Sequence, residues 1–216
     1  MWVRETASTS VTIGLPTSSV EALDLHERER WTRLVQPRDA TAYLELHLLA
    51  RREIGRQVGV PAAALRFDRA CPDCGRQHGV PRLLDDHGLH LSLSRSGSVV
   101  ALALSRSGPV GVDVDQVGGT QFSGYEDVAL HADERDQTAS GFADATTWVR
   151  KEAALKALGV GLRVDPTTFA APPRRGRPRM VPGMPPVTVV DLDVPMPYAA
   201  AVALRSPPGA LTVRRH

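Results

Sequence analysis

The chain has 216 residues, of which 42% are hydrophobic, so it can bury the core of one large domain or two small ones; this excludes a disordered chain and a peptide hormone. Its formal net charge is only +2, from 26 basic and 24 acidic residues, which disfavours a nucleic-acid coat protein. The first residues lack the apolar stretch of a secretory signal, and no run approaches the ~20 apolar residues of a membrane span. We therefore expect a cytoplasmic protein that binds neither nucleic acid nor membrane.

The predicted elements of the first half are a strand, a helical region, a long helix and a hairpin. The first strand is expected at residues 11–14. The long helix is expected to begin at Pro37, because apolar side chains then recur at helical spacing, at Ala42, Leu46, Leu49, Ala50, Ile54 and Val58. Strands at residues 90–94 and 99–104, joined by Arg-Ser-Gly-Ser, form the predicted hairpin.

Between the long helix and this hairpin lie two cysteines, Cys71 and Cys74, in a Cys-Pro-Asp-Cys-Gly segment. Two thiols are too few for a disulfide scaffold. Structural zinc normally has four ligands, and His78 and His87 are candidates to complete such a set. The simpler interpretation is a tight turn with two reduced thiols, and the missing second cysteine pair favours it.

The second half repeats this order of elements. Its strand, helix and hairpin strands fall, in order, at residues 110–115, 148–158, 187–192 and 198–204. The helix is expected to end at Gly159 and to have its N-cap at Asp144, Thr146 or Thr147. The repeat predicts an α+β fold, a pseudo-dimer of two similar subdomains at residues 1–107 and 108–216. Each subdomain is a small, mostly antiparallel sheet packed on a long helix, with the active site in the cleft between them.

Two carboxylates stand on one face of the strand at 110–115. Side chains alternate along a strand, so Asp113 and Asp115 point the same way, about 7 Å apart. Like charges this close repel each other, and Mg²⁺, which prefers carboxylate oxygen, relieves the repulsion. The alternative interpretation is a solvated strand end.

The helix at 148–158 carries a second pair of charged residues. Glu152 and Lys156 are four positions apart and therefore share a helix face. The alternative is an ordinary surface ion pair, but bulky apolar residues on that face place Glu152 at the margin of a core. Arg supplies 24 of the 26 basic residues, and both lysines, Lys151 and Lys156, lie in this segment. A compact ammonium reaches a single phosphate oxygen in a narrow site, where a planar guanidinium does not.

These residues resemble the surfactin-synthetase-activating type of 4′-phosphopantetheinyl transferase. Gly-Val-Asp-Val-Asp at 111–115 and Trp-Val-Arg-Lys-Glu-Ala-Ala-Leu-Lys at 148–156 look like the Gly-Val/Ile-Asp-Val/Ile-Glu strand and the Trp-x-x-Lys-Glu-Ala-x-x-Lys helix of that family. In the first half, residues 91–97 are similar to Phe-Asn-Ile-Ser-His-Ser-Gly, 78–81 to Gly-Lys-Pro, and 48–51 to a helix motif.

The resemblance implies an enzyme that transfers the 4′-phosphopantetheine arm of coenzyme A to a serine of an acyl or peptidyl carrier protein, as used in polyketide or nonribosomal peptide biosynthesis. It implies that adenosine 3′,5′-bisphosphate is released and that the enzyme is a monomer with pseudo-twofold symmetry. Mg²⁺ would be held by Asp113, Asp115 and Glu152 in the second subdomain. Glu152 and Lys156 would be catalytic, with Glu152 taking the serine proton and Lys156 neutralising the pyrophosphate. The expected coenzyme contacts are Arg51, Arg82, Ser94, Arg95 and Lys156.

This sequence departs from the family pattern at three positions: Arg95 replaces a histidine, Val80 a lysine and Asp115 a glutamate. Two alternative functions follow, a non-catalytic homologue that binds coenzyme A and carrier protein, and another Mg²⁺-dependent phosphohydrolase.

Two further features are compared with the family. Glu134 lies near the sequence position at which the family has a further acidic residue. The arginines of 173–179 either face the acidic carrier protein or form a solvated loop.

Overall fold

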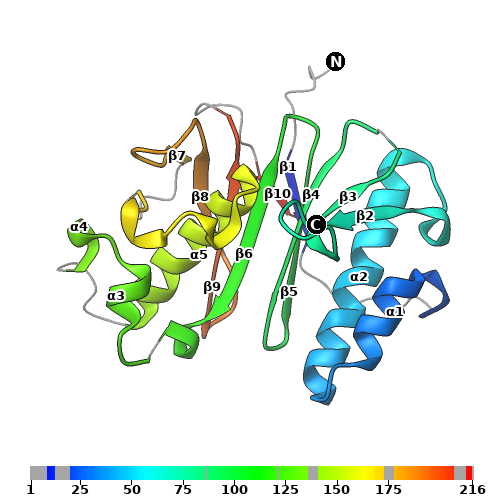
Figure 1. The fold of residues 1–216 in the computed structure, drawn as a ribbon, viewed down its shortest axis with the longest axis horizontal. Coiled ribbons are helices and arrows are strands. Elements are labelled where there is room, and N and C mark those ends of the chain that lie inside the picture. Colours follow the sequence, from blue (N-terminus) through cyan, green and yellow to red (C-terminus); the bar gives the residue numbers. More distant parts are fainter. Residues whose placement is uncertain are drawn as a thin grey trace.

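The computed structural model describes residues 9–12, 20–85, 87–120, 122–135, 141–172, 178–206 and 213–215. Two sheets, each covered by one long helix, make up most of this part of the chain (Figure 1). The helices are α1 (Leu25–Thr32), α2 (Pro37–Val58), α3 (Tyr125–Ala129), α4 (Ala132–Arg135) and α5 (Gly141–Leu158). Short 3₁₀ helices are η1 (Val20–Ala22), η2 (Ala62–Ala64), η3 (Val117–Thr120), η4 (Gly161–Arg163) and η5 (Pro166–Thr168).

The first sheet has the strand order β10-β1-β5-β4, and the second has the order β6-β9-β8-β7. Their strands are β1 (Thr9–Thr12), β4 (His90–Ser96), β5 (Val99–Ser105), β6 (Val110–Gln116), β7 (Arg179–Met180), β8 (Thr188–Leu192), β9 (Tyr198–Leu204) and β10 (Val213–Arg215). A separate hairpin is formed by β2 (Phe67–Ala70) and β3 (Gln77–Leu83). Small antiparallel sheets combined with helices confirm the α+β class predicted from the sequence.

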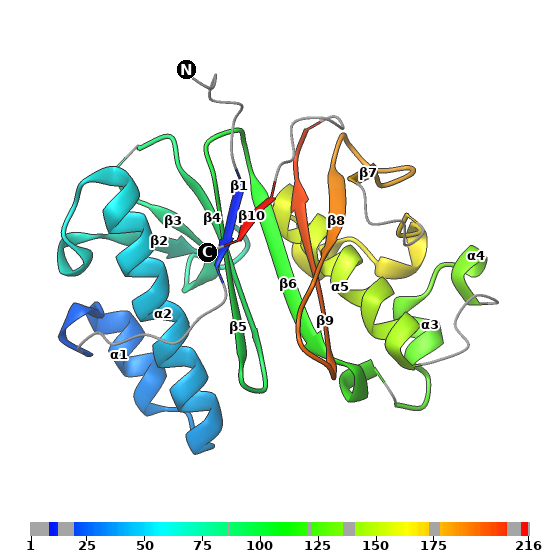
Figure 2. The ribbon, with the colours of Figure 1, turned by 180° about the vertical axis from the view of Figure 1, so that it is seen from behind.

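The two sheets share a connectivity. In each, the first strand pairs antiparallel with the last strand of the hairpin, β1 with β5 and β6 with β9, and that strand pairs with its hairpin partner. Two strands fall outside this pattern: β7 pairs antiparallel with β8, and β10 pairs in parallel with β1 (Figure 2). The last described strand therefore lies in the sheet of the first half, across the predicted boundary at residues 107 and 108.

The long helices follow the sequence prediction at two of the three ends that it gave, the start of α2 and the end of α5. Helix α2 has Pro37 at its first position and ends at Gly59, whose φ of 72° is in the left-handed region that glycine favours. Helix α5 ends before Gly159, as predicted, but it begins at Gly141, ahead of the start expected near residue 148. The predicted N-cap positions 144, 146 and 147 therefore lie inside the helix. Ala145 in this first part is fully buried, so tertiary packing extends the helix beyond its local signals.

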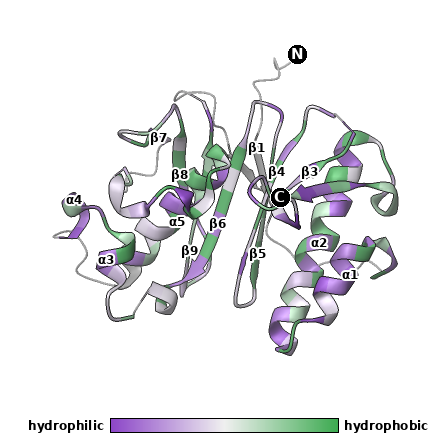
Figure 3. Cartoon of the chain, in the orientation of Figure 1, coloured by the Kyte–Doolittle hydropathy of each residue, from purple (hydrophilic) through white to green (hydrophobic). Residues whose placement is uncertain are grey.

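Small side chains bring α5 close to the second sheet. The buried core there combines four alanines of the helix with alanines of β9; the group comprises Ala145, Ala153, Ala154, Ala157, Ala199, Ala201 and Ala203. The other core, under α2, is built from larger aliphatic side chains such as Leu49, Ile54 and Leu102. Hydrophobic residues occupy β8 and much of β6, whereas α1 is largely hydrophilic (Figure 3). No helix in the described ranges is long and apolar enough to cross a membrane.

Serine side chains join the two sheets. The hydroxyl oxygens of Ser92, Ser94 and Ser96 on β4 accept hydrogen bonds from the backbone N–H groups of Val112, Val114 and Gln116 on β6, at 3.0, 3.2 and 3.2 Å. Each serine is twenty positions before its partner, so the two strands run parallel. The hydroxyls satisfy N–H groups at the edge of the second sheet and hold the two halves together.

Candidate active site

Strand β6 presents Asp113 and Asp115 toward β4, on the same face, as the alternation of side chains predicted. Asp113 is only 7% exposed, and its Oδ1 accepts a hydrogen bond from Ser94 Oγ at 2.7 Å. Asp115 is half-buried, and its Oδ1 accepts from Ser96 Oγ and from the backbone N–H of Gln116, both at 2.8 Å. The serines that join the sheets therefore also orient both carboxylates.

Helix α5 brings Lys156 to the same place. Its Nζ donates to Asp113 Oδ1 at 2.6 Å and to the carbonyl oxygen of Val112 at 3.1 Å. The approach depends on Gly111, where a Cβ would lie 2.0 Å from the carbonyl oxygen of Ala153 and 2.9 Å from Cβ of Lys156. The ion pair between helix and strand thus requires a residue without a side chain at position 111.

Glu152 lies one helical turn before Lys156, where it is half-buried. Its Oε1 is buried and has no hydrogen-bond partner. Burial raises the pKa of Glu152, and the neighbouring negative charge of Asp113 raises it further, although Lys156 lowers it. Burial likewise raises the pKa of Asp113, with Lys156 acting in the opposite direction. The structure therefore brings Asp113, Glu152 and Lys156 into electrostatic contact, with one carboxylate oxygen unsatisfied.

The carboxylate oxygens of the three predicted metal ligands are not gathered around one point in the structure. Among the residues that the structure describes, three metal-ligating atoms within 4.8 Å of one another occur at Cys71, Cys74 and His78, and not at Asp113, Asp115 and Glu152. The two aspartates accept protein donors instead, from Ser94, Ser96 and Lys156. Their role as metal ligands stays a prediction.

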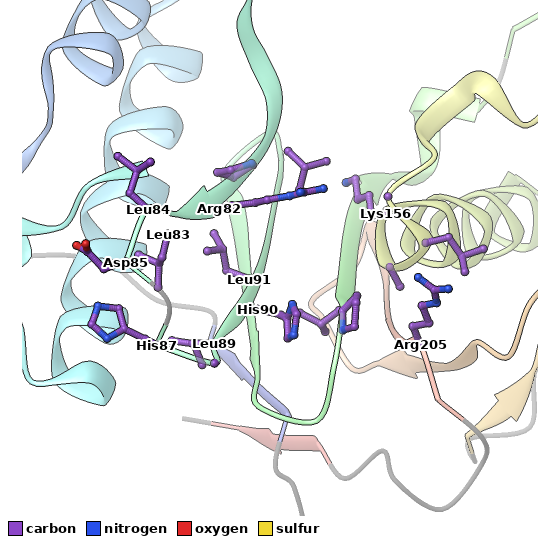
Figure 4. A pocket seen from close by; sticks show the side chains of 18 residues that line it. Arg82, Leu83, Leu84, Asp85, His87, Leu89, His90, Leu91, Lys156 and Arg205 are labelled. Carbon is purple, nitrogen blue, oxygen red and sulfur yellow. The ribbon is translucent and has the colours of Figure 1, made fainter. Parts of the chain in front are cut away.

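Two cavities flank strand β3 and share Lys156 in their walls. The first, of about 480 Å³, is lined by β3 and β4 on one side and by Lys156 and Arg205 on the other. In Figure 4, Arg82 extends from β3 toward Lys156 across this cavity. The second, of about 340 Å³, also has Val80 in its wall.

The second cavity has a basic lining. It includes the cationic side chains of Arg30, Arg69, Arg95 and Lys156, and none of the described lining residues is acidic. Such a wall attracts an anionic ligand. Three of the five predicted coenzyme contacts, Arg82, Arg95 and Lys156, thus line one or both cavities. Ser94 lines neither cavity; its hydroxyl donates to Asp113 Oδ1 and accepts from the backbone N–H of Val114.

Arg51 also lies outside the cavities, in a buried ionic network. It is 1% exposed and donates to Glu27 at 2.6 Å, to Asp24 at 2.7 Å and to two backbone carbonyl oxygens at 2.9 Å. Arg69 donates to the same two acids. The structure therefore gives Arg51 a role in joining α1, α2 and the segment before β2, with no face open to a coenzyme.

The same network shifts the pKa of Glu27. Burial alone raises it, but hydrogen bonds and positive charge from His47 and Arg51 outweigh burial and lower the pKa to about 2. Burial lowers the pKa of His47, whereas Arg51 and Arg69 stay charged and each donate to Glu27 at 2.6 Å.

The second lysine of the chain is structural. Lys151 is buried; its Nζ lies 2.5 Å from Glu134 and donates to the carbonyl oxygens of Ala129 and Pro166 at 2.7 and 2.8 Å. Glu134 in turn accepts from the backbone N–H groups of His131 and Ala171, both at 2.7 Å. Of the two lysines, Lys156 therefore belongs to the candidate site and Lys151 to the core.

The arginine-rich segment can be only partly located. Arg179 is exposed on β7, whereas Arg174, Arg175 and Arg177 lie outside the described residues. Its expected role toward a carrier protein stays a prediction.

Comparison with known proteins matches a family model to the part of the chain that contains β6 and α5. Residues 109–191, from β6 to β8, match the family model described as the 4′-phosphopantetheinyl transferase superfamily. The L-aminoadipate-semialdehyde dehydrogenase-phosphopantetheinyl transferase of Pongo abelii is 27% identical to this chain over 165 residues, which is 67% of the chain and 50% of that protein. The chain thus spans about half the length of this curated relative.

Proposed function

We propose that this protein is a phosphopantetheinyl transferase, which moves the 4′-phosphopantetheine arm of coenzyme A to a serine of an acyl or peptidyl carrier protein. The observation that carries the proposal is the position of Lys156. It pairs with Asp113 on β6, inside the matched segment, and lines both cavities, one of which has no acidic side chain among its described lining residues. A highly anionic substrate fits that wall, and both cavity volumes are within the range of small-molecule sites.

We assign the phosphates of coenzyme A to the basic cavity. Arg95 and Lys156 reach it from opposite halves of the chain, and Arg30 adds charge from the first half, whereas Arg69 is paired with Asp24 and Glu27. Arg82 faces Lys156 from the neighbouring cavity and supplies the cation that Val80 lacks (Figure 4). A guanidinium at position 95 is able to bind a phosphate with two parallel hydrogen bonds.

The acidic residues fit a divalent cation. Glu152 has a buried oxygen without a partner, the pKa of both Glu152 and Asp113 is raised by burial, and no side chain at Gly119 crowds the Asp115 carboxylate. We propose that Asp113, Asp115 and Glu152 hold Mg²⁺, which when bound neutralises charge on the pyrophosphate of the substrate.

The chain's own groups then have distinct roles. Glu152 accepts the proton of the carrier serine as the general base. Lys156 neutralises the negative charge that develops on the departing phosphate. Asp113 holds the Lys156 ammonium in place through the 2.6 Å contact.

The proposal includes the pseudo-dimer that the sequence repeat predicts. The shared connectivity of the two sheets and the parallel contact of β4 with β6 support it, as do walls contributed by both halves to each cavity. We expect a monomer with its active site between the halves. The cytoplasmic location stays a prediction.

The test is to incubate the protein with Mg²⁺, coenzyme A and an apo carrier protein and to weigh the carrier by mass spectrometry. We expect a gain equal to the phosphopantetheine arm and a loss of rate of about 100-fold or more for Glu152→Gln, since general bases contribute factors of this size. Glu126→Gln, on the exposed surface of α3, is the matched control and should keep the rate. Lys156→Arg keeps the charge but not the compact shape, so we expect a clear loss of rate.

Three results would contradict the proposal. Binding of coenzyme A and carrier without a mass gain would indicate the non-catalytic homologue. Release of inorganic phosphate without a carrier would indicate the phosphohydrolase. A Lys156→Arg variant as fast as the wild type would remove the assigned role of the ammonium.

A further inference from the structure

The hairpin of β2 and β3 ends in three side chains with metal-binding chemistry. Cys71, Cys74 and His78 each place a ligand atom within 4.8 Å of the other two, and Cys74 Sγ lies 3.0 Å from His78 Nε2. Zinc binds sulfur at about 2.3 Å and nitrogen at about 2.0 Å, so ligand atoms around a tetrahedral ion are separated by roughly 3.5 Å. The observed spacing requires only small side-chain movements to reach that geometry.

The backbone of the turn places these side chains together. The N–H of Cys71 donates to the carbonyl oxygen of Arg76, and the N–H of Gly75 donates to the carbonyl oxygen of Cys71, both at 2.8 Å. Gly75 has a φ of 70°, in the region that favours glycine. This tight turn brings the two thiols of a Cys-x-x-Cys pair to one side, and the first residues of β3 add the imidazole. His87 is not part of the group.

The tip of this hairpin has little apolar packing to hold it. Every residue from Pro72 to His78 is exposed, and β3 has no fully buried side chain. The base is fixed by Arg69 in the buried ionic network, and a bond of Arg163 to Asp73, at 3.0 Å, reaches the tip from η4. A two-stranded hairpin of this kind is marginally stable on its own. Coordination of one ion by three side chains would order the tip.

We propose that Cys71, Cys74 and His78 bind a Zn²⁺ ion, with solvent at the fourth position. Two thiolates and an imidazole select zinc over the hard cation Mg²⁺, so this site is distinct from the carboxylates of β6 and α5. His78 and the next residues, Gly79 and Val80, line the basic cavity. The ion therefore holds one wall of that cavity in place, whichever reaction the cavity serves.

The direct test is the metal content of the full chain, purified in reductant from zinc-supplemented cells. We expect about one zinc per chain in the wild type and at least a tenfold reduction in Cys71→Ser/Cys74→Ser and in His78→Ala. His87→Ala, which removes a nearby histidine outside the group, is the matched control and should retain the metal. His78→Cys replaces one zinc ligand by another and should retain it too.

Two further measurements keep the test decisive if a variant folds poorly. Cobalt added to the metal-free wild type should give thiolate-to-cobalt charge-transfer absorption, which carboxylate sites do not produce. Trypsin should cleave after Arg76 in the exposed tip faster once a chelator is added to the wild type, with no such acceleration in Cys71→Ser/Cys74→Ser.

Any of three findings would overturn the zinc site. The first is that the wild-type protein takes up no zinc on reconstitution. The second is that the Cys71→Ser/Cys74→Ser variant contains as much zinc as the wild type. The third is that Cys71 and Cys74 form a disulfide although the protein is purified in reductant. Because metal content and proteolysis are measured without carrier protein or coenzyme A, their outcome is independent of the proposed transferase activity.

Discussion

Gly111→Ala adds one methyl group where strand β6 crosses helix α5. A Cβ at this position would lie 2.0 Å from the carbonyl oxygen of Ala153, 2.5 Å from the backbone nitrogen of Ala157 and 2.9 Å from Cβ of Lys156. Two of these three atoms belong to the helix backbone, so no side-chain rotation relieves the clash. The helix must move away from the sheet.

The size of the effect follows from these distances. Real Cβ contacts are essentially never shorter than 3.0 Å, so the helix must retreat by about 1 Å from the Ala153 carbonyl. Overpacking a core typically costs about 1–3 kcal/mol, and moving α5 also loosens the alanine contacts along β9. Replacing Gly by Ala in a strand would otherwise stabilise by about 0.5–1 kcal/mol. We therefore expect a net loss of about 2 kcal/mol.

Denaturation in urea, followed by far-UV circular dichroism, measures this loss as a lower midpoint with an unchanged slope. Gly118→Ala is the matched control, because a Cβ there meets nothing within 4 Å; its free energy of unfolding should stay within about 0.5 kcal/mol of the wild type. If Gly111→Ala costs less than about 1 kcal/mol, the close approach of helix and strand, and with it the geometry of the Lys156–Asp113 pair, is wrong.

Three further variants test other parts of the structure by the same unfolding measurement. Glu27 has a folded-state pKa of about 2 against an ordinary value of 4.5, so its contribution is complete above pH 4.5 and should fall away between pH 4.5 and 2, by roughly 3 kcal/mol. Glu27→Gln should flatten this pH dependence, and an unchanged slope would contradict the assignment. Lys151→Met leaves Glu134 buried without its cation and should cost about 3–5 kcal/mol, of which Lys151→Met/Glu134→Gln recovers part; no recovery would argue against the pair. Ser94→Ala removes one hydroxyl of the junction between the sheets and should cost about 1–3 kcal/mol, so a neutral result would contradict the bonding of β4 to β6.

Part of the candidate site could be predicted because it depends on local periodicity. Alternation along β6 places Asp113 and Asp115 on one face of the strand, and the i, i+4 spacing places Glu152 and Lys156 on one face of helix α5. Neither placement depends on the rest of the chain. Arg51 shows where this reasoning stops. Its helix position was apparent from the sequence, but whether its guanidinium meets a coenzyme or Glu27 depends on α1, which packs beside it only in the folded chain.

The serines of β4 illustrate the same limit. The sequence predicts a strand at residues 90–94, which includes Ser92 and Ser94, but the partners of the serine hydroxyls are twenty residues away on β6. Likewise, the two lysines are equally rare in composition, yet Lys151 is buried against Glu134 and Lys156 faces the cavities. Composition alone does not separate a structural ammonium from one at a ligand site.

The amino-acid sequence by itself determined the repeated order of elements, the faces that carry the acids, the start of the first long helix at Pro37 and the end of the second at Gly159. Hydrophobic period and the backbone preferences of proline and glycine act over a few residues. The tertiary structure alone decided which helix face meets which strand. Gly111 and the alanines of α5 and β9 permit that close approach, and only the approach brings Lys156 to Asp113. Contacts between residues far apart in the chain depend on the packing of whole elements, which local patterns do not encode.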